Sequence, residues 1–191
     1  MSKFKGYIFR RPYNQLVLLV TILVLALSAC SGNQDAAGLT GSWTGTVDGS
    51  GAFIAIASNG TEVMAYVCDG STISQWFKGT AGVDAVDLAS GKVDLSKGDA
   101  RLQANLASDQ ASGSLTLADG TTYNFLAPRA AGDAGLYRLE ESRDGDDWVG
   151  GWVVLNDGNL RGALVSSLGK FEAQTSLDSA ARLISPDMRV Y

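Results

Sequence analysis

The chain contains two thiols, Cys30 and Cys68, and no histidine. Without an imidazole group, neither a Ser-His-Asp nor a Cys-His catalytic arrangement can form. Two thiols without histidine also fall short of an ordinary zinc site. Cys30 ends an apolar leader, whereas Cys68 ends the apolar segment 61–68, where we expect a buried thiol. A reactive or intermolecular role for Cys68 is the alternative.

The leader before Cys30 has the pattern of a secretory signal peptide. Residues 16–27 are apolar except for Thr21, and the residues before them include four basic and no acidic side chains. A helix over this apolar segment would be about 18 Å long, which is too short for a hydrocarbon core of ~30 Å. A basic start, a short apolar segment and small residues before a cut site are typical of export. We therefore expect residues 1–29 to be removed.

The end of this leader, Leu27-Ser28-Ala29-Cys30, resembles the lipobox of bacterial lipoproteins. In that family the cysteine thiol receives a diacylglycerol, with fatty acids such as palmitate, and the chain is cut just before it. The resemblance implies cleavage between Ala29 and Cys30, lipid attachment at Cys30, and a place in the cell envelope on the extracytoplasmic side of a membrane. An ordinary signal peptide with an incidental cysteine, or an uncleaved anchor, are the alternatives.

Residues 30–39 are predicted to be the lipidated cysteine and a tether, because residues 31–39 are small and polar without a period. Such a flexible segment spans roughly 15–18 Å. The chain has 15 basic and 20 acidic residues, and four of the basic ones lie in the leader, so the mature part has a net charge of −9. An acidic body is repelled by nucleic acids and anionic lipid head groups, and we exclude nucleic acid as a partner.

The body of the chain has the pattern of an antiparallel β protein. Short apolar runs are separated by Asn-Gly, Asp-Gly and Ser-Gly pairs, and no segment after residue 30 has a strong helical period. We expect an all-β fold, with an antiparallel barrel or strongly curved sheet over 40–129. A C-terminal β-hairpin extension over 130–191 should pack on it, and the small residues 130–133 mark the boundary.

A hairpin over 52–68 predicts what must surround it. Asn59-Gly60 tolerates φ > 0, so we expect a two-residue type I′ turn that places Ser58 opposite Thr61. Both faces of this hairpin are then apolar, and both should be covered. A second hairpin over 148–166 is the candidate cover. Further strands are expected at 40–47, 100–106, 111–117, 121–128 and 135–141, and the segment 73–79 is either a short strand or one helical turn. A weak pair is expected around 90–91, a short helix over 177–183 and a last edge at 190–191.

Carboxylates are numerous, but most lie in Asp-Gly turns, where local hydrogen bonds are their usual role. Asp144-Gly145-Asp146-Asp147 could offer oxygens to Ca²⁺, but it lacks the EF-hand pattern, and a solvated turn is favoured. No two carboxylates can be paired as acid and base from the sequence. We therefore expect no enzyme activity, no metal and no cofactor. Exposed aromatics, with Trp76 and Trp148 as candidates, would favour a carbohydrate or protein partner, although core packing is the default.

The body resembles three groups of proteins. Gly41-Ser42-Trp43 is similar to the G-x-W opening of calycin barrels, in which the tryptophan closes the barrel floor. Residues 66–70, with Trp76 and Gly79, look like lipoprotein inhibitors of lysozyme, without the disulfide and the Ser-Gly-x-x-Tyr loop of those proteins. The body is also similar to bacterial envelope β-domains for which no activity is known, over most of its length, from VDGSGAFIAI through QWFKG to GWVVL.

These patterns together predict a membrane-anchored envelope lipoprotein with a non-enzymatic binding or structural role. The membrane is the expected partner through the lipid anchor, with an envelope protein or a small ligand as a second partner. A calycin-like small-ligand binder and an inhibitor of a cell-wall hydrolase are the alternatives.

Overall fold

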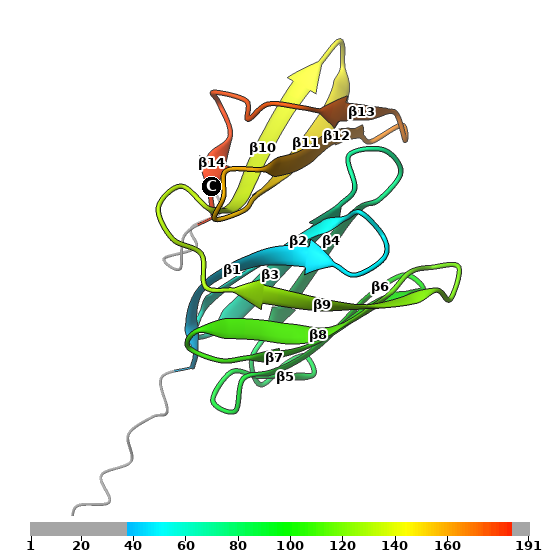
Figure 1. Cartoon of the computed structure of the whole chain (residues 1–191). Helices are drawn as coiled ribbons and strands as arrows, with labels where there is room; N and C mark the ends of the chain where they lie inside the picture. Colours follow the sequence, from blue (N-terminus) through cyan, green and yellow to red (C-terminus); the bar gives the residue numbers. More distant parts are fainter. Residues whose placement is uncertain (1–37, 185–191) are drawn as a thin grey trace, which may run out of the picture. The chain divides into compact units, whose positions relative to one another are not determined.

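The computed structural model describes residues 38–184 of the chain, which belong to a single compact unit. Within the described range every regular element is a β-strand, so the expected all-β antiparallel fold is confirmed. A helix that could cross a membrane is not found among these residues. The strands form a nine-stranded sheet that nearly closes into a barrel and a five-stranded sheet that follows it in the chain (Figure 1).

The nine-stranded sheet is an up-and-down meander. Its order is β4-β3-β2-β1-β9-β8-β7-β6-β5, so successive strands pair with each other and β1 pairs with β9. The hydrogen-bonded ladder is interrupted between β4 and β5. The strands are β1 (Thr40–Val47), β2 (Phe53–Asn59), β3 (Glu62–Cys68), β4 (Ser74–Thr80), β5 (Val86–Asp87), β6 (Lys92–Lys97), β7 (Ala100–Leu106), β8 (Gln110–Thr116) and β9 (Thr122–Pro128).

The five-stranded sheet begins after a connection over 129–134. Its order is β13-β12-β11-β10-β14, again antiparallel throughout. The predicted hairpin over 148–166 forms its centre, as β11 and β12. The strands are β10 (Gly135–Arg143), β11 (Asp146–Val154), β12 (Leu160–Ser166), β13 (Phe171–Gln174) and β14 (Arg182–Leu183).

Side chains, rather than a ladder, close the gap between β4 and the β5–β6 pair. Gly79 of β4 lies so close to this pair that an added Cβ would overlap Leu95 Cδ2 and lie 2.9 Å from Val86 Cγ2. Both of these side chains belong to the barrel core. We refer to this place, where two strand edges meet without pairing, as the seam.

The barrel interior is filled by the inward-facing side chains of its strands. Strand β7 shows the expected alternation, because Ala100, Leu102, Ala104 and Leu106 are buried and the residues between them are exposed. Trp43 is completely buried, and its indole N–H donates to the carbonyl of Ala107 in the β7–β8 turn at 2.9 Å. These side chains give the barrel a continuous apolar core, which supplies much of its stability.

The guanidinium of Arg129 covers the outer side of Trp43, at 5.2 Å from the ring centroid. Gly41 leaves the space for this guanidinium, since a Cβ at that position would collide with it. The Gly-Ser-Trp segment of β1 thus combines a buried ring with the room that its cationic neighbour needs.

The first hairpin has the predicted faces but not the predicted turn. Ser58 pairs with Val63, so Gly60 and Thr61 are the central turn residues instead of Asn59 and Gly60. The Asn59 side chain accepts a hydrogen bond from the Thr61 backbone N–H at 2.9 Å, and Gly60 alone supplies the positive φ, 86°. The type I′ prediction is therefore wrong by one residue. Each residue of β2 therefore pairs two positions further along β3, and because side chains alternate with a period of two, the same side chains stay on each face.

Both faces of the β2–β3 hairpin are buried, as expected. Ile54 and Val67 point into the barrel core. On the opposite face, Tyr66 packs in a second cluster with Leu136 of β10 and Val153 of β11. The C-terminal sheet therefore covers the side of the hairpin that a bare barrel would leave in water.

Glycines allow the two sheets to come this close. A Cβ on Gly151 of β11 would lie 2.6 Å from Tyr66 Cζ and 2.7 Å from Trp76 Cζ2. Within the five-stranded sheet, Gly150 and Gly162 leave room for the ring of Trp152, which is completely buried. Small residues on β11 and β12 are thus a requirement of the packing between aromatic rings.

The C-terminal part differs from the prediction. The expected helix over 177–183 is absent, and the chain instead forms β14, in which Leu183 pairs with Tyr137 of β10. Burial of Ile184, whose backbone N–H donates to Leu136 at 2.7 Å, outweighs the weak helical pattern. Strand β13 was not expected, and the predicted edge at 190–191 lies outside the described residues.

We predict that Gly151→Ala destabilises the protein by about 1–3 kcal/mol, because the new methyl group must displace two rings packed between the sheets. Urea unfolding followed by tryptophan fluorescence measures this change. Asn124→Ala, at an exposed position of β9, is the matched control and should stay within about 0.5 kcal/mol of the unmodified protein. Equal stability of the two variants would contradict the close packing of the sheets.

Candidate functional site

The predicted cleavage and lipid-attachment residues, Ala29 and Cys30, lie outside the described residues. The chain is fixed to the barrel from Leu39 onward. The Leu39 backbone N–H donates to the carbonyl of Leu88 at 2.9 Å, and the Ser58 hydroxyl donates to the carbonyl of Leu39 at 2.7 Å. The predicted tether therefore joins the body at a defined place, beside the end of β5.

Cys68 is a buried structural thiol. Its exposed fraction is zero, and the Gly70 backbone N–H donates to its Sγ at 3.3 Å. Burial raises the pKa of the Cys68 thiol, which keeps it in the protonated, unreactive form. The nearby Tyr66 hydroxyl is within hydrogen-bond distance of Ser74, at 2.9 Å, and burial also raises the pKa of Tyr66. The expectation of a buried thiol is confirmed.

Trp148 offers no open ring for a ligand. Only 5% of the residue is exposed. Arg143 and Lys170 lie over its ring, at 5.5 Å and 5.9 Å from the centroid, respectively. Trp148 is therefore part of the packing of the second sheet, which is the default expected of it, and its exposure as a binding residue is not seen.

Trp76 is half-buried between two side chains. The Tyr66 ring centroid is 4.4 Å from that of Trp76, and the Arg138 guanidinium carbon is 4.6 Å from it. Trp76 also borders a groove of about 400 Å³ next to the seam. The groove is lined by Met64, Trp76, Phe77, Lys78, Ser96, Lys97 and Arg138.

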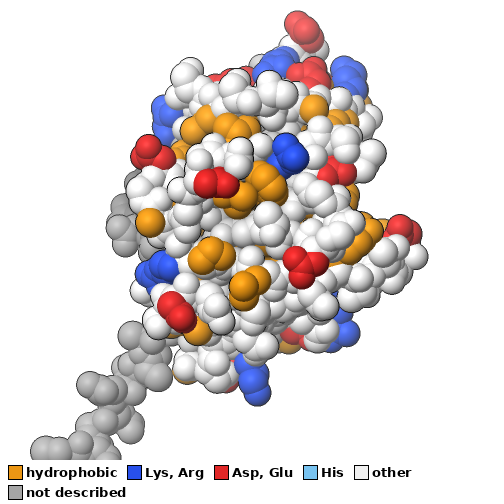
Figure 2. All heavy atoms as spheres, in the orientation of Figure 1, with side chains coloured by type: hydrophobic (Ala, Val, Ile, Leu, Met, Phe, Trp, Pro, Cys, Tyr) orange, Lys and Arg blue, Asp and Glu red, His pale blue; other side chains and the backbone are white. Residues whose placement is uncertain are grey.

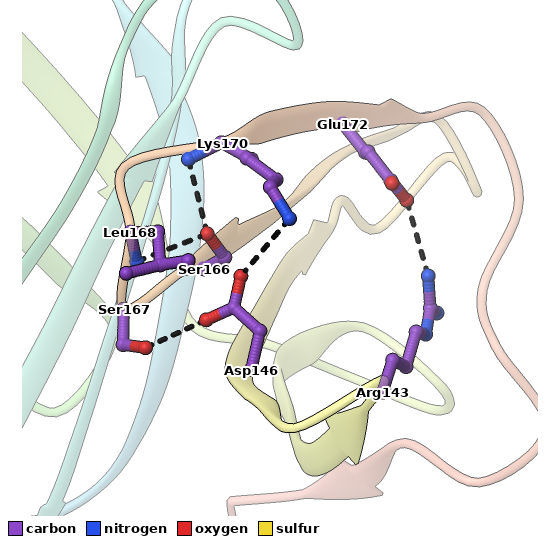
Figure 3. A network of polar contacts seen from close by, with 7 residues as sticks. All are labelled: Arg143, Asp146, Ser166, Ser167, Leu168, Lys170 and Glu172. Carbon is purple, nitrogen blue, oxygen red and sulfur yellow. Dashed lines mark hydrogen bonds and ion pairs between the residues drawn. The ribbon is translucent and has the colours of Figure 1, made fainter.

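The segment 144–147 forms a tight turn between β10 and β11. Asp144 and Gly145 both have positive φ, 52° and 79°, and this is the conformation of a type I′ turn. Asp146, 5% exposed, accepts from the Ser167 hydroxyl at 2.6 Å and pairs with Lys170 Nζ at 3.4 Å (Figure 3). The Ser167 hydrogen bond holds the pKa of Asp146 below its usual value.

This network of polar contacts joins the turn between β10 and β11 to the turn between β12 and β13. Lys170 and Ser167 belong to the turn after β12, and Arg143 pairs with Glu172 of β13 at 3.1 Å (Figure 3). Among residues 38–184 no group of three or more acidic or thiol side chains is placed to hold a metal ion. Of the carboxylates considered for Ca²⁺, Asp146 and Asp147 have partners within the protein, since the Ser142 hydroxyl donates to Asp147.

Other carboxylates make local hydrogen bonds in turns, as expected from the Asp-Gly pairs in which most of them lie. Asp69 Oδ1 accepts from the backbone N–H groups of Ser71, Thr72 and Ile73, each at 2.8 Å. Partial burial alone would raise the pKa of Asp69, but these three hydrogen bonds outweigh it and hold the pKa well below its usual value. Asp87, Asp119 and Asp157 accept similar local hydrogen bonds.

Exposed apolar side chains are few and come from separate segments. The large ones among the described residues are Val83, Leu126, Leu168, Leu177 and Leu183. On the face shown in Figure 2, single charged groups of both signs alternate with small apolar areas. A second, polar groove of about 500 Å³ crosses β6–β9. Its lining includes Asp94, whose carboxylate accepts hydrogen bonds from the side chains of Arg101 and Gln103.

Comparison of the chain with protein-family models, with curated proteins and with solved structures found no match. The candidate site therefore depends on the geometry described above. Sequence reasoning found Trp76 but missed Lys97 and Arg138, which reach the same groove from β6 and β10. No sequence signal links these two residues, because only the packing of the second sheet brings Arg138 to the seam.

We predict that Cys68 reacts with iodoacetamide only after unfolding, because its thiol is buried and protonated. In a chain comprising residues 31–191, Cys68 is the single cysteine, so mass spectrometry measures its labelling directly. The same chain in concentrated urea is the control and should label fully. Fast labelling of the folded chain would contradict the burial.

Cys68→Ser should lower the free energy of unfolding by about 1–3 kcal/mol. An unchanged melting midpoint of this variant would also contradict the burial.

We predict that the stability supplied by Asp69 is lost in acid. Its folded-state pKa lies below the unfolded value of about 3.9, so the contribution is full above that value and disappears as the pH falls through the folded-state pKa. Asp69→Asn keeps one acceptor oxygen but removes the charge. Allowing for solvent screening, it should be less stable by about 0.5–1 kcal/mol near neutral pH, and the difference should vanish in strong acid. A difference that does not change with pH would refute this role.

Proposed function

We propose that this protein is a membrane-anchored lipoprotein of the cell envelope, whose β body has a binding or structural role without catalysis. The observation that carries the proposal is the segment Leu27-Ser28-Ala29-Cys30 at the end of a basic and apolar leader. After Cys30, a short polar segment leads to Leu39, where the chain becomes part of a compact β body. This order of leader, cysteine, tether and folded body is what an anchored envelope protein needs.

The roles of the reactive groups support a non-enzymatic body. The thiol of Cys68 is buried and protonated, and Asp69 and Asp146 are bound by hydrogen bonds within turns. Catalytic acids and bases need a shifted pKa together with access to a substrate. The pKa of Cys68 is instead shifted by burial, and the pKa values of Asp69 and Asp146 are shifted by hydrogen bonds within the fold.

The filled barrel interior favours binding at the surface over a calycin-like cavity. Ile54, Phe77 and Leu102 occupy the interior in which a calycin ligand would lie. The groove beside Trp76 is therefore the better candidate for a ligand.

The anchor is tested by replacing the cysteine. Cys30→Ala should abolish incorporation of labelled palmitate in a bacterial host and leave the leader uncut, because the thiol is the acceptor of the lipid. Palmitate labelling followed by gel electrophoresis measures both effects. Cys68→Ala is the control, and it should be labelled and cut like the unmodified chain. Normal labelling of the Cys30→Ala variant would overturn the proposal.

A further inference from the structure

The groove beside the seam combines cationic groups with an apolar floor. Lys78 comes from β4, Lys97 from the end of β6 and Arg138 from β10 of the second sheet. Met64 and the half-buried Trp76, both on the outer face of the barrel, form the apolar part, whereas the Phe77 side chain points into the barrel core. Three cations from three strands and two sheets therefore converge on one groove, although the mature chain is strongly acidic.

The seam explains why a groove exists at this place. At Gly79, β4 is pressed against Leu95 and Val86, and no space remains. Lys78 precedes Gly79 on β4, and Ser96 follows Leu95 on β6. Both of these residues line the groove. Since β4 and β6 are not hydrogen-bonded to each other, their side chains determine the opening between them.

The charges of the groove are only partly compensated. Lys78 Nζ lies 3.2 Å from a Glu62 carboxylate oxygen, and Arg138 Nε donates to Glu140 at 3.0 Å. Lys97 has no carboxylate within ion-pair distance among the described residues. Arg138 is held over Trp76, with 21% of its side chain exposed, so its guanidinium is already oriented before a ligand arrives.

We infer that this groove binds a small amphiphilic anion, a carboxylate or phosphate group carried by a short apolar chain. Lys97, Arg138 and the Ser96 hydroxyl are suited to the anionic oxygens, and Met64 and the edge of Trp76 to the apolar chain. A volume of about 400 Å³ lies in the range of small-ligand sites. A bare inorganic anion would leave the apolar floor uncovered, and an uncharged apolar molecule would leave Lys97 without a partner.

This inference rests on the binding role proposed above but not on the lipid anchor. It can therefore be tested on a chain comprising residues 31–191, which includes the whole compact unit and lacks Cys30. If the anchor test fails, the groove and its ligand class are unaffected. If the ligand test fails, the anchor is unaffected.

The binding test compares probes that separate charge from apolar character. Octanoate and octyl phosphate carry both features, 1-octanol carries only the chain, and acetate and inorganic phosphate carry only the anion. Isothermal titration calorimetry should show binding of at least one octyl anion, about tenfold or more tighter than 1-octanol, acetate or inorganic phosphate. No binding of either octyl anion, or equal affinity for an octyl anion and 1-octanol or the short anions, would overturn the inference.

The location is tested with two lysines of the same strand. Lys97→Gln should weaken the binding of octyl anions about tenfold through the loss of one charge-assisted contact. Lys92→Gln is the matched control, because Lys92 is exposed at the other end of β6 and lines the polar groove instead. Both variants should keep the melting temperature of the unmodified chain, which separates loss of binding from loss of folding. Equal weakening by the two substitutions would place the ligand elsewhere and contradict the inference.

Discussion

The two apolar faces of the β2–β3 hairpin are the constraint on which the rest of the structure depends. One face contributes Ile54, Ile56 and Val67 to the barrel core, and the other presents Tyr66 and Met64. A single barrel could bury the first face only, and the second would remain in water at a cost of about 25 cal/mol for each Å² of apolar surface. The five-stranded sheet meets this requirement, since Leu136 and Val153 pack against the second face.

The same constraint explains the glycines of the second sheet. Tyr66 and Trp76 project from β3 and β4 toward β11, and Gly151 is the residue that leaves them space. Once β10 lies over this face, Arg138 stacks on Trp76 and reaches the seam. The groove is therefore a consequence of the packing between the sheets, and neither sheet contains all of its lining.

Much of the fold could be predicted from the sequence, because alternation and turn residues are local signals. Strand β1 and strand β7 have the predicted bounds, and both covered faces of the first hairpin follow from its composition. The turn at Gly60 was misplaced by one residue because the Asn59 side chain accepts backbone hydrogen bonds, a role that competes with positive φ at that position. Strands β13 and β14 were missed because their short segments pair only after β10 and β12 are in place.

The candidate site could be predicted much less well. The sequence singled out Trp76 and Trp148 by residue type, with the polar neighbours Gln75 and Lys78 favouring Trp76, but long-range partners determine the surroundings of both rings. Arg143 and Lys170 cover Trp148, whereas Trp76 keeps an edge on a groove. No local pattern distinguishes these two outcomes, because the cations come from other strands.

The central claim is that residue 30 carries the lipid that holds this β body in the envelope. Mass spectrometry of the N-terminal peptide of the mature protein, taken from the native membrane fraction, tests it most directly. The account predicts a peptide that begins at Cys30 and carries a diacylglyceryl group on its thiol. A mature peptide with an unmodified Cys30, or one that still contains residues of the leader, would contradict it.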